Sequence, residues 1–351
     1  AYDELLASQV ALRLVRAQQR RTRGRPLKVA GPFRQKAIAA LPFRLTGAQL
    51  RSLAEIDADM AAEGRMLRLL QGDVGSGKTV VAFLAMLNAV ESGAQAALMA
   101  PTEILARQHH ATIAPLAESV GVRVALLTGR DTGAARERLL AQLAAGAIDI
   151  LIGTHALISE DVDYRDLVFA VVDEQHRFGV HQRMSLSAKG ERADILVMTA
   201  TPIPRTLLLA HYGDLDSSRL DEKPANRKPI DTRIVSLERL EEVYPAIRRA
   251  LVEGARVYWV CPLVEESVDT DLAAATERHR NLEKRFPGRA GLVHGRLPGR
   301  ERDKVMRRFA SGEIAVLVAT TVIEVGVDVP EATVMIVEHA ERFGLAQLHQ
   351  L

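Results

Sequence analysis

The sequence predicts an α/β protein with two tandem lobes, each built around a mainly parallel sheet. Short apolar runs alternate with longer helical patterns from residue 65 to about residue 211, and again from residue 232 onwards. Continuous apolar runs such as LVFAVV (167–172) suit parallel strands that are buried on both faces. The length of 351 residues is enough for about two domains, each with its own core.

The order of these patterns predicts the domain organisation. Strands of the first lobe are expected at 65–71, 95–100, 123–127, 148–153, 167–172 and 194–199, and those of the second lobe at 232–236, 256–261, 290–294, 314–319 and 333–338. Residues 214–230 are rich in charge and proline and have no period, so they are predicted to be the linker. The first lobe would then span 41–213 and the second 231–351.

Residues 1–40 are expected to form a basic, largely helical segment before the first lobe. Residues 13–28 hold seven Arg or Lys and no acid. Such a run is either a solvated helix face or a segment that contacts phosphates. The chain begins without Met, in what reads as the middle of a helix, so we expect it to be a piece of a longer protein.

Composition excludes several classes of protein. One cysteine, Cys261, rules out an internal disulfide framework and argues against a structural zinc site; it is expected in the core. No run approaches the roughly 18 apolar residues of a membrane span, and no signal peptide opens the chain. We therefore expect a cytoplasmic protein with no membrane association. The net charge of +2 does not by itself indicate a nucleic-acid partner.

A glycine-rich loop lies between a predicted buried strand and a predicted buried helix. Its pattern, G-x-x-x-x-G-K-[ST], is carried by Gly72, Asp73, Val74, Gly75, Ser76, Gly77, Lys78 and Thr79. The glycines allow successive N–H groups to point inward, and the following helix adds its positive end. Lys78 would reach the β- and γ-phosphates of a nucleotide, and the Thr79 hydroxyl would hold Mg²⁺. The alternative is a plain glycine turn, but the strand expected before the loop and the helix expected after it favour the phosphate-binding interpretation.

Two acids follow the predicted strand at 167–172. Asp173 would be the Mg²⁺ carboxylate, and Glu174 would orient the attacking water. Ligands bind at the carboxyl ends of strands in open α/β sheets, which is where these residues are expected. Acids at this position are also common as helix caps. Because the same sequence also contains the glycine-rich loop, the catalytic interpretation is favoured.

The loop and the acids together resemble the superfamily 2 helicases and translocases, and further motifs follow in that family's order. These are FRLTGAQ, APTEILARQH, LLTGR, IGTHAL, MTATPIPRTL, VHGRLP and ATTVIEVGVDVPEATVMIVEHAERFGLAQLHQL. The phrases QGDVGSGKT, DEQHRFGV, TATPIPRTL and TTVIEVGVDVP together are similar to the RecG family of DNA translocases. The transcription-repair coupling translocases resemble the chain too, but that family usually has DEEH where residues 173–176 read DEQH.

The resemblance implies a fold, cofactors and partners. It implies two RecA-like lobes that use ATP and Mg²⁺ to move along branched or forked double-stranded DNA. In the cell this activity would drive Holliday junction branch migration and reversal of stalled replication forks during repair and recombination. A monomer in the bacterial cytoplasm is expected, with single-stranded DNA-binding protein as a further partner.

The resemblance also assigns residues by motif. Gln49 would contact the adenine edge, His176 would lie beside the γ-phosphate, and Gly326 and Asp328 would face the nucleotide. Thr199 and Thr201 would couple the nucleotide to DNA. The implied DNA contacts are Pro101, Thr102, Arg107, Thr128, Gly129, Arg130, Thr154, His155, His294, Gly295, Arg296 and Thr321.

Each of these assignments has a plainer alternative. Thr102 could simply cap a helix, as could the threonine before Pro202, Thr201; the glycines could simply make turns, and His176 could be structural. Where a threonine opens a helix, however, the first N–H groups can also bind a backbone phosphate of any sequence.

The chain departs from the family pattern at both ends. The arginine-rich segment that reaches the γ-phosphate would lie beyond residue 351, and the wedge domain would lie before residue 1. Two other functions therefore stay open: a transcription-repair coupling translocase acting on RNA polymerase, and a nucleic-acid-binding fragment with little ATPase activity. An RNA helicase is disfavoured by the DEQH sequence and the RecG-like phrases.

Overall fold

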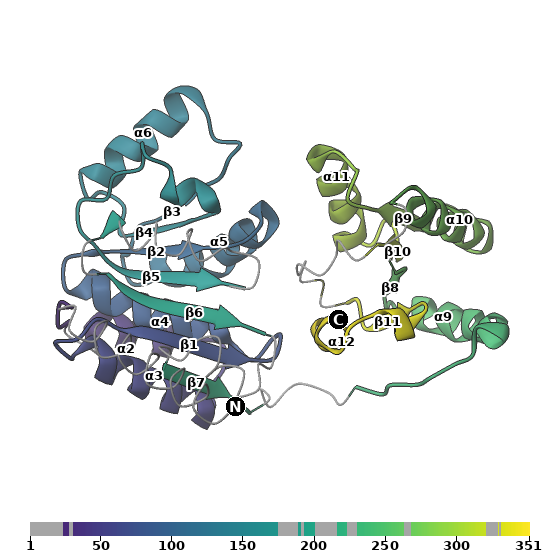
Figure 1. Cartoon of the computed structure of the whole chain (residues 1–351), viewed down its shortest axis with the longest axis horizontal. Helices are drawn as coiled ribbons and strands as arrows, with labels where there is room; N and C mark the ends of the chain where they lie inside the picture. Colours follow the sequence, from purple (N-terminus) through teal and green to yellow (C-terminus); the bar gives the residue numbers. More distant parts are fainter. Residues whose placement is uncertain are drawn as a thin grey trace, which may run out of the picture. The chain divides into compact units, whose positions relative to one another are not determined.

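The computed structural model describes residues 24–27, 31–174, 189–190, 193–200, 216–222, 230–262, 268–320, 329 and 331–351. The chain divides into two compact units, Ala1–Arg227 and Lys228–Leu351. Each unit carries its own parallel sheet with helices packed against it (Figure 1). The prediction of two tandem α/β lobes is therefore confirmed. The predicted basic run 13–28 lies almost entirely outside the described residues.

The first unit contains a seven-stranded sheet with the order β3-β4-β2-β5-β6-β1-β7. Its strands are β1 (Leu67–Gly72), β2 (Gln95–Met99), β3 (Val124–Leu127), β4 (Ile150–Gly153), β5 (Leu167–Asp173), β6 (Asp194–Thr199) and β7 (Asp216–Leu220). Neighbouring strands are parallel throughout. Every residue of β2, β4, β5 and β6 is buried, as expected for strands covered on both faces.

Helices pack against the sheet of the first unit. They are α2 (Pro32–Ala40), α3 (Gly47–Met60), α4 (Lys78–Glu91), α5 (Glu103–Glu118), α6 (Gly133–Ala144) and the 3₁₀ turn η1 (His155–Ile158). Helix α4 packs on β1, β2 and β5 and is covered in turn by α2 and α3, so nearly its whole circumference is buried. Because these strands are parallel, the carboxyl ends of β1 to β6 all lie at the same edge of the sheet.

Helix α2 corrects the predicted start of the first lobe. It lies inside the segment 1–40 that was expected to precede the lobe, yet it packs on α4. Arg34 of α2 is 6% exposed and forms an ion pair with Asp57 of α3, at 2.6 Å from Nη1 to Oδ1. The Glu91 carboxylate at the end of α4 accepts the backbone N–H of Arg34 at 3.0 Å. These contacts integrate α2 into the first unit.

Strand β7 corrects the predicted linker. Residues 214–230 were expected to be irregular, but Asp216–Leu220 pair in parallel with β1. The sequence DSSRL hides a period of two in which Ser218 and Leu220 are buried while Ser217 and Arg219 are exposed. Ser218 is stabilised by Arg68 of β1, whose Nη1 donates to the serine hydroxyl at 2.9 Å. A polar edge strand gives no apolar run, which is why composition alone misses it.

The second unit contains a four-stranded parallel sheet with the order β11-β8-β10-β9. Its elements are η3 (Leu237–Glu242), α9 (Val243–Val252), β8 (Val257–Val260), α10 (Val268–Arg285), β9 (Ala290–Val293), α11 (Gly299–Ala310), β10 (Val316–Ala319), β11 (Val334–Val337), η5 (Ala340–Arg342) and α12 (Leu345–Gln350). Helices α9 and α10 pack around Trp259 on one face, and α11 brings Phe309 to the other. Cys261 is buried in the first of these clusters, as predicted.

The predicted strand at 232–236 is wrong. Residues 230–236 form no helix or strand, and the Ile234 side chain is fully exposed. A run of β-branched residues becomes a strand only where a neighbouring strand pairs with it, and none of the described strands does so here. Among the described residues, no helix is both long and apolar enough to cross a membrane.

Candidate active site

The glycine-rich loop joins the end of β1 to the start of α4, as the sequence predicts. Gly75 and Gly77 have φ values of 77° and 87°, in the left-handed region that favours glycine. Helix α4 has no side-chain cap, whereas α3 and α5 are capped by Thr46 and Thr102. The N-terminus of α4, which carries partial positive charge, therefore meets the loop without a side-chain cap, as suits an anion site.

Close packing explains two of the loop glycines. A Cβ on Gly72 would lie 2.5 Å from Ser76 Oγ and 2.8 Å from Leu220 Cβ of β7. A Cβ on Gly77 would lie 2.3 Å from Gln49 Nε2. The Ser76 hydroxyl is buried without a hydrogen-bond partner, which leaves a polar atom inside the cradle. These features fit a bound phosphate group.

Lys78 is held within the loop. Its Nζ donates to the carbonyl oxygen of Gly72 at 2.6 Å and to that of Asp73 at 3.1 Å. The ammonium group therefore lies over the backbone that would surround the phosphates. Thr79 follows Lys78 on the first turn of α4. Consecutive residues therefore supply the ammonium group and the hydroxyl group.

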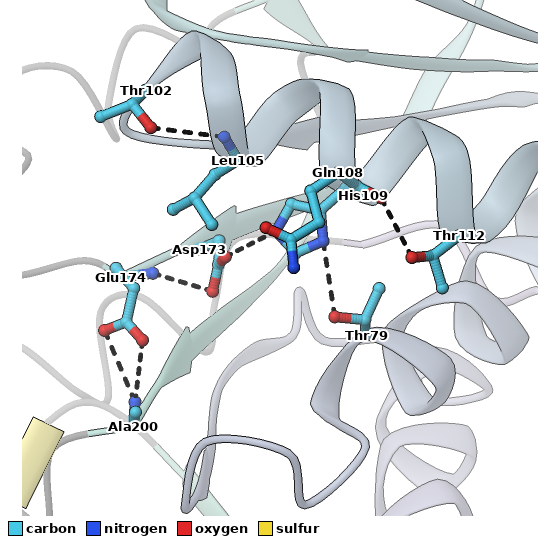
Figure 2. A network of polar contacts seen from close by, with 9 residues as sticks. All are labelled: Thr79, Thr102, Leu105, Gln108, His109, Thr112, Asp173, Glu174 and Ala200. Atoms are coloured by element: carbon cyan, nitrogen blue, oxygen red, sulfur yellow. Dashed lines mark hydrogen bonds and ion pairs between the residues drawn. The ribbon is translucent and has the colours of Figure 1, made fainter. Parts of the chain in front are cut away.

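Asp173 and Glu174 stand at the carboxyl end of β5, the position that the sequence predicts (Figure 2). Asp173 is 6% exposed, and its Oδ1 accepts the backbone N–H of Glu174 at 3.0 Å. Glu174 has a φ of 46°, a left-handed conformation that costs a non-glycine residue roughly 1–3 kcal/mol. Its carboxylate accepts the backbone N–H of Ala200, at 3.2 Å from Oε1.

A histidine joins the loop to the acids, and sequence reasoning missed it. His109 of α5 lies with Nε2 at 2.6 Å from Asp173 Oδ2 and Nδ1 at 3.4 Å from Thr79 Oγ1 (Figure 2). Thr79 and Asp173, the two predicted Mg²⁺ ligands, are thus bridged by one imidazole ring. The only sequence signal was the position of His109 in the motif APTEILARQH, seven residues after Thr102. The described residues contain no cluster of three or more His, Cys, Asp or Glu that could hold a metal by itself.

Gln49 is placed beside the loop but is already engaged. It is 3% exposed, and its Nε2 donates to the Ser76 carbonyl oxygen at 2.8 Å. Its Oε1 accepts the N–H of Thr46 at 2.9 Å, completing the capping box of α3. In this geometry the carboxamide supports the phosphate loop; its predicted contact with adenine stays a prediction.

Most of the implied DNA contacts of the first unit follow three neighbouring strands. Pro101 and Thr102 follow β2, the segment 128–130 follows β3, and Thr154 and His155 follow β4. Because parallel strands end at one edge of the sheet, these residues share that edge with Asp173. His155 is exposed, whereas Thr154 is buried with its hydroxyl unpartnered.

The helix cap predicted at Thr102 is present, and an acid next to it organises two of the implied contacts. Thr102 Oγ1 accepts the N–H of Leu105 at 3.4 Å. The Glu103 carboxylate forms ion pairs with Arg107 at 2.8 Å and with Arg130 at 2.9 Å. The two arginines, predicted to contact phosphates, are therefore joined across the gap between α5 and the loop after β3.

Thr128 differs from its predicted role as a direct contact. It is fully buried, and both its N–H and its hydroxyl donate to Asp131 Oδ2, at 2.6 Å and 2.9 Å. Thr128 therefore shapes the turn, while its exposed neighbours Gly129 and Arg130 remain accessible.

The second unit places its motifs at the carboxyl edge of its own sheet. His294, Gly295 and Arg296 follow β9, and Thr320 follows β10. Burial and the nearby Arg296 charge lower the pKa of His294. Thr320, which the sequence analysis did not select, is 2% exposed with its hydroxyl unpartnered. His176, Thr201, Thr321, Gly326 and Asp328 lie outside the described residues, while Thr199 ends β6.

Comparison with known proteins defines the class. Residues 46–209 match the DEAD/DEAH box helicase family, and residues 238–351 match the helicase conserved C-terminal domain. Fold and site together therefore define the two-domain core of a helicase. More narrowly, the chain is similar over its whole length to proteins described as the ATP-dependent DNA helicase RecG.

Three relatives support this placement. The chain is 49% identical over its whole length to the ATP-dependent DNA helicase RecG of Thermotoga maritima and 48% identical to that of Bacillus subtilis, covering 45% and 52% of those proteins. It superposes on a solved structure described as RecG bound to a three-way DNA junction, with a TM-score of 0.85, 46% identity, and coverage of all of this chain and 46% of that one. The chain thus spans about half the length of the relatives it matches.

Proposed function

We propose that this chain is the ATP-driven motor of a DNA helicase that acts on branched double-stranded DNA. The observation that carries the proposal is that the glycine-rich loop and Asp173 lie close together. His109 forms one hydrogen bond with Thr79 of the loop and one with Asp173. Support for the substrate comes from the relatives, which are named ATP-dependent DNA helicase RecG, and from the solved RecG that is bound to a three-way junction.

The residues divide the chemistry of hydrolysis between them. The loop amides and the N-terminus of α4 bind the triphosphate, and Lys78 places its ammonium at the β- and γ-phosphates. Thr79 and Asp173 would hold Mg²⁺, which when bound supplies positive charge to the phosphates and orients them. Glu174 orients the attacking water, and His176 would lie beside the γ-phosphate.

Coupling to DNA runs through backbone contacts in this proposal. The N-terminus of α5 and the loops after β3 and β4 bind the phosphate backbone without reading sequence. Thr199 and Thr201 would couple the nucleotide to DNA. The hydrogen bond between Glu174 and Ala200 supports this role, because it connects the water-orienting carboxylate to the residue between the two threonines. In the second unit, His294 to Arg296 and Thr321 would grip the strand, and Gly326 and Asp328 would face the nucleotide.

In the cell, this motor would drive branch migration of Holliday junctions and reversal of stalled forks. We further propose single-stranded DNA-binding protein as a partner, a monomeric state and a location in the bacterial cytoplasm. The RecG names of the relatives favour this role over transcription-repair coupling.

Replacing the loop lysine tests the site assignment. In the full-length protein, Lys78→Ala should abolish ATP hydrolysis stimulated by branched DNA, because the charge at the β- and γ-phosphates is lost. Circular dichroism should show an unchanged fold. Unchanged turnover in this variant would refute the site assignment, and stronger stimulation by RNA than by junction DNA would refute the substrate.

A further inference from the structure

The ring of His109 is enclosed and makes two directed contacts. Its side chain is 9% exposed and that of Asp173 is 8% exposed, so water competes little for this contact. The distance of 2.6 Å from Nε2 to Asp173 Oδ2 is typical of a strong hydrogen bond to a carboxylate. The contact with Thr79 Oγ1, at 3.4 Å, is longer and weaker.

The chemistry of the two partners assigns the hydrogens. A carboxylate only accepts, so Nε2 must carry a proton towards Asp173. In the neutral ring Nδ1 then accepts, and the Thr79 hydroxyl donates to it. This arrangement turns the Thr79 proton towards the histidine and leaves the oxygen lone pairs for a cation. The second oxygen of Asp173 is fixed by the Glu174 N–H.

We propose that His109 is a positioning residue that holds both Mg²⁺ ligands, Thr79 and Asp173, in the orientation that binds the cation. The inference rests on the proposed nucleotide site and adds a residue to it. His109 does not touch the nucleotide or the cation; it fixes the rotamers of the two side chains that do. Partners of this kind around metal ligands typically change metal affinity by roughly 10- to 100-fold when removed.

Helix α5 also connects His109 to the proposed DNA contact at Thr102. Helix α5 begins at Glu103, directly after Thr102, the proposed phosphate contact. The seven residues from Thr102 to His109 span about 10 Å of helix at 1.5 Å per residue. One rigid element therefore joins the DNA-facing end of α5 to both Mg²⁺ ligands, and His109 is the side chain that closes the connection.

Three substitutions separate the two contacts. His109→Ala removes both. His109→Gln can place an amide N–H near the position of Nε2 and keep the contact with Asp173. His109→Asn reaches only the position of Nδ1 and keeps the contact with Thr79. His110→Ala is the matched control, because His110 is the next residue on α5 and lies outside this network.

The experiment measures binding of a fluorescent N-methylanthraniloyl ADP to the full-length protein, with Mg²⁺ and with EDTA. His109→Ala should reduce the tightening of binding by Mg²⁺ roughly 10-fold or more, with binding in EDTA unchanged. His109→Gln should recover most of the tightening and His109→Asn little, because the shorter contact is the one to Asp173. His110→Ala should match the wild type.

The outcomes distinguish this inference from the proposed function. Wild-type tightening in His109→Ala, while Thr79→Ala loses it, would overturn the role of His109 and leave the nucleotide site intact. Equal losses with Mg²⁺ and with EDTA in His109→Ala and His109→Gln would also overturn it, since they indicate a purely structural role. Unchanged binding in both Thr79→Ala and Lys78→Ala would instead refute the nucleotide site itself.

Discussion

At the scale of single residues, the phosphate loop depends on glycine for two separate reasons. Gly77 has a left-handed backbone, and its α-hydrogen faces the Gln49 amide. Gly93, just after α4, also has a left-handed backbone, with a φ of 75°, but nothing lies within 4 Å of the Cβ it would carry. The two positions therefore share backbone strain and differ in packing.

This pair allows strain and packing to be separated. Gly77→Ala and Gly93→Ala should both lose roughly 1–3 kcal/mol of stability, because alanine is strained at positive φ. Only Gly77→Ala should also weaken nucleotide binding, since its methyl group would displace Gln49 from the loop. Thermal unfolding and ADP titration measure the two effects; equal nucleotide affinity in both variants would contradict the packing argument.

Asp194 is a buried carboxyl group at the start of β6, far along the strand from the nucleotide edge. It is 2% exposed, and its Oδ1 accepts the Met66 N–H at 2.7 Å. Burial raises its pKa from an ordinary value of 3.8 to about 7, although the nearby Arg65 charge acts in the opposite direction. The folded state therefore binds a proton that the unfolded chain releases near pH 4.

The resulting pH dependence has a definite sign. Because the folded pKa is raised, the contribution of Asp194 to stability is present at low pH and is lost as the pH rises from about 4 to about 7. Relative to wild type, Asp194→Asn should therefore gain stability as the pH rises from about 4 to about 7, by at most about 1.4 kcal/mol per pH unit.

Urea unfolding at several pH values measures this difference. Asp161→Asn serves as the control, because Asp161 is exposed and its hydrogen bond with Arg136 lowers its pKa. A constant difference between wild type and Asp194→Asn across this range would contradict the assignment.

At the scale of elements, α5 performs two jobs at different points along its length. Its N-cap, Thr102, stabilises the helix and lies at the proposed DNA edge. Its seventh residue, His109, reaches the carboxylate at the end of β5. In such a helix, function constrains which polar residues occur, and packing constrains which apolar residues occur on the buried face.

Substitutions at Thr102 distinguish capping from phosphate binding. Thr102→Ala should lose about 1 kcal/mol of stability with the cap. Thr102→Asp should keep that stability, because aspartate caps well, but its charge should repel a DNA phosphate and weaken DNA binding. Thr102→Ser should preserve both properties. Fluorescence anisotropy with a labelled junction checks the DNA effect, and wild-type affinity in Thr102→Asp would exclude a phosphate contact there.

At the scale of the whole molecule, the chain has separate cores in its two units. The core of the second unit surrounds Trp259, which is fully buried and is the one tryptophan in the sequence. The phosphate loop belongs to the first unit. Tryptophan fluorescence therefore reports on the second unit, whereas far-ultraviolet circular dichroism reports on both.

Nucleotide should stabilise the two units differently. Mg²⁺-ADP at 100 times its dissociation constant should add about 2.7 kcal/mol to the stability of the unit that binds it. In this chain, melts followed by circular dichroism should show a transition that moves upward with ADP, while the Trp259 fluorescence transition moves less. Equal shifts by both probes would show that the units unfold together.

Much of the fold could be predicted from local pattern. Six strands of the first unit and four of the second lie where apolar runs predict them, because buried parallel strands need such runs. The run at 232–236 was wrongly predicted to be a strand because its composition also suits one, but no described strand pairs with it. Strand β7 was missed because polar residues at an edge carry no such signal.

The sequence alone determined the phosphate loop, the paired acids after β5 and the division into two lobes, since each depends on residues close together along the chain. Only the tertiary structure decided that His109 bridges Thr79 and Asp173, that Gln49 supports the loop, and that Glu103 joins Arg107 to Arg130. These contacts join residues 27 to 64 positions apart, except for the helical pair within α5. No local pattern records such pairs, because the packing of α3 and α5 beside the carboxyl edge of the sheet is what brings them within hydrogen-bonding distance.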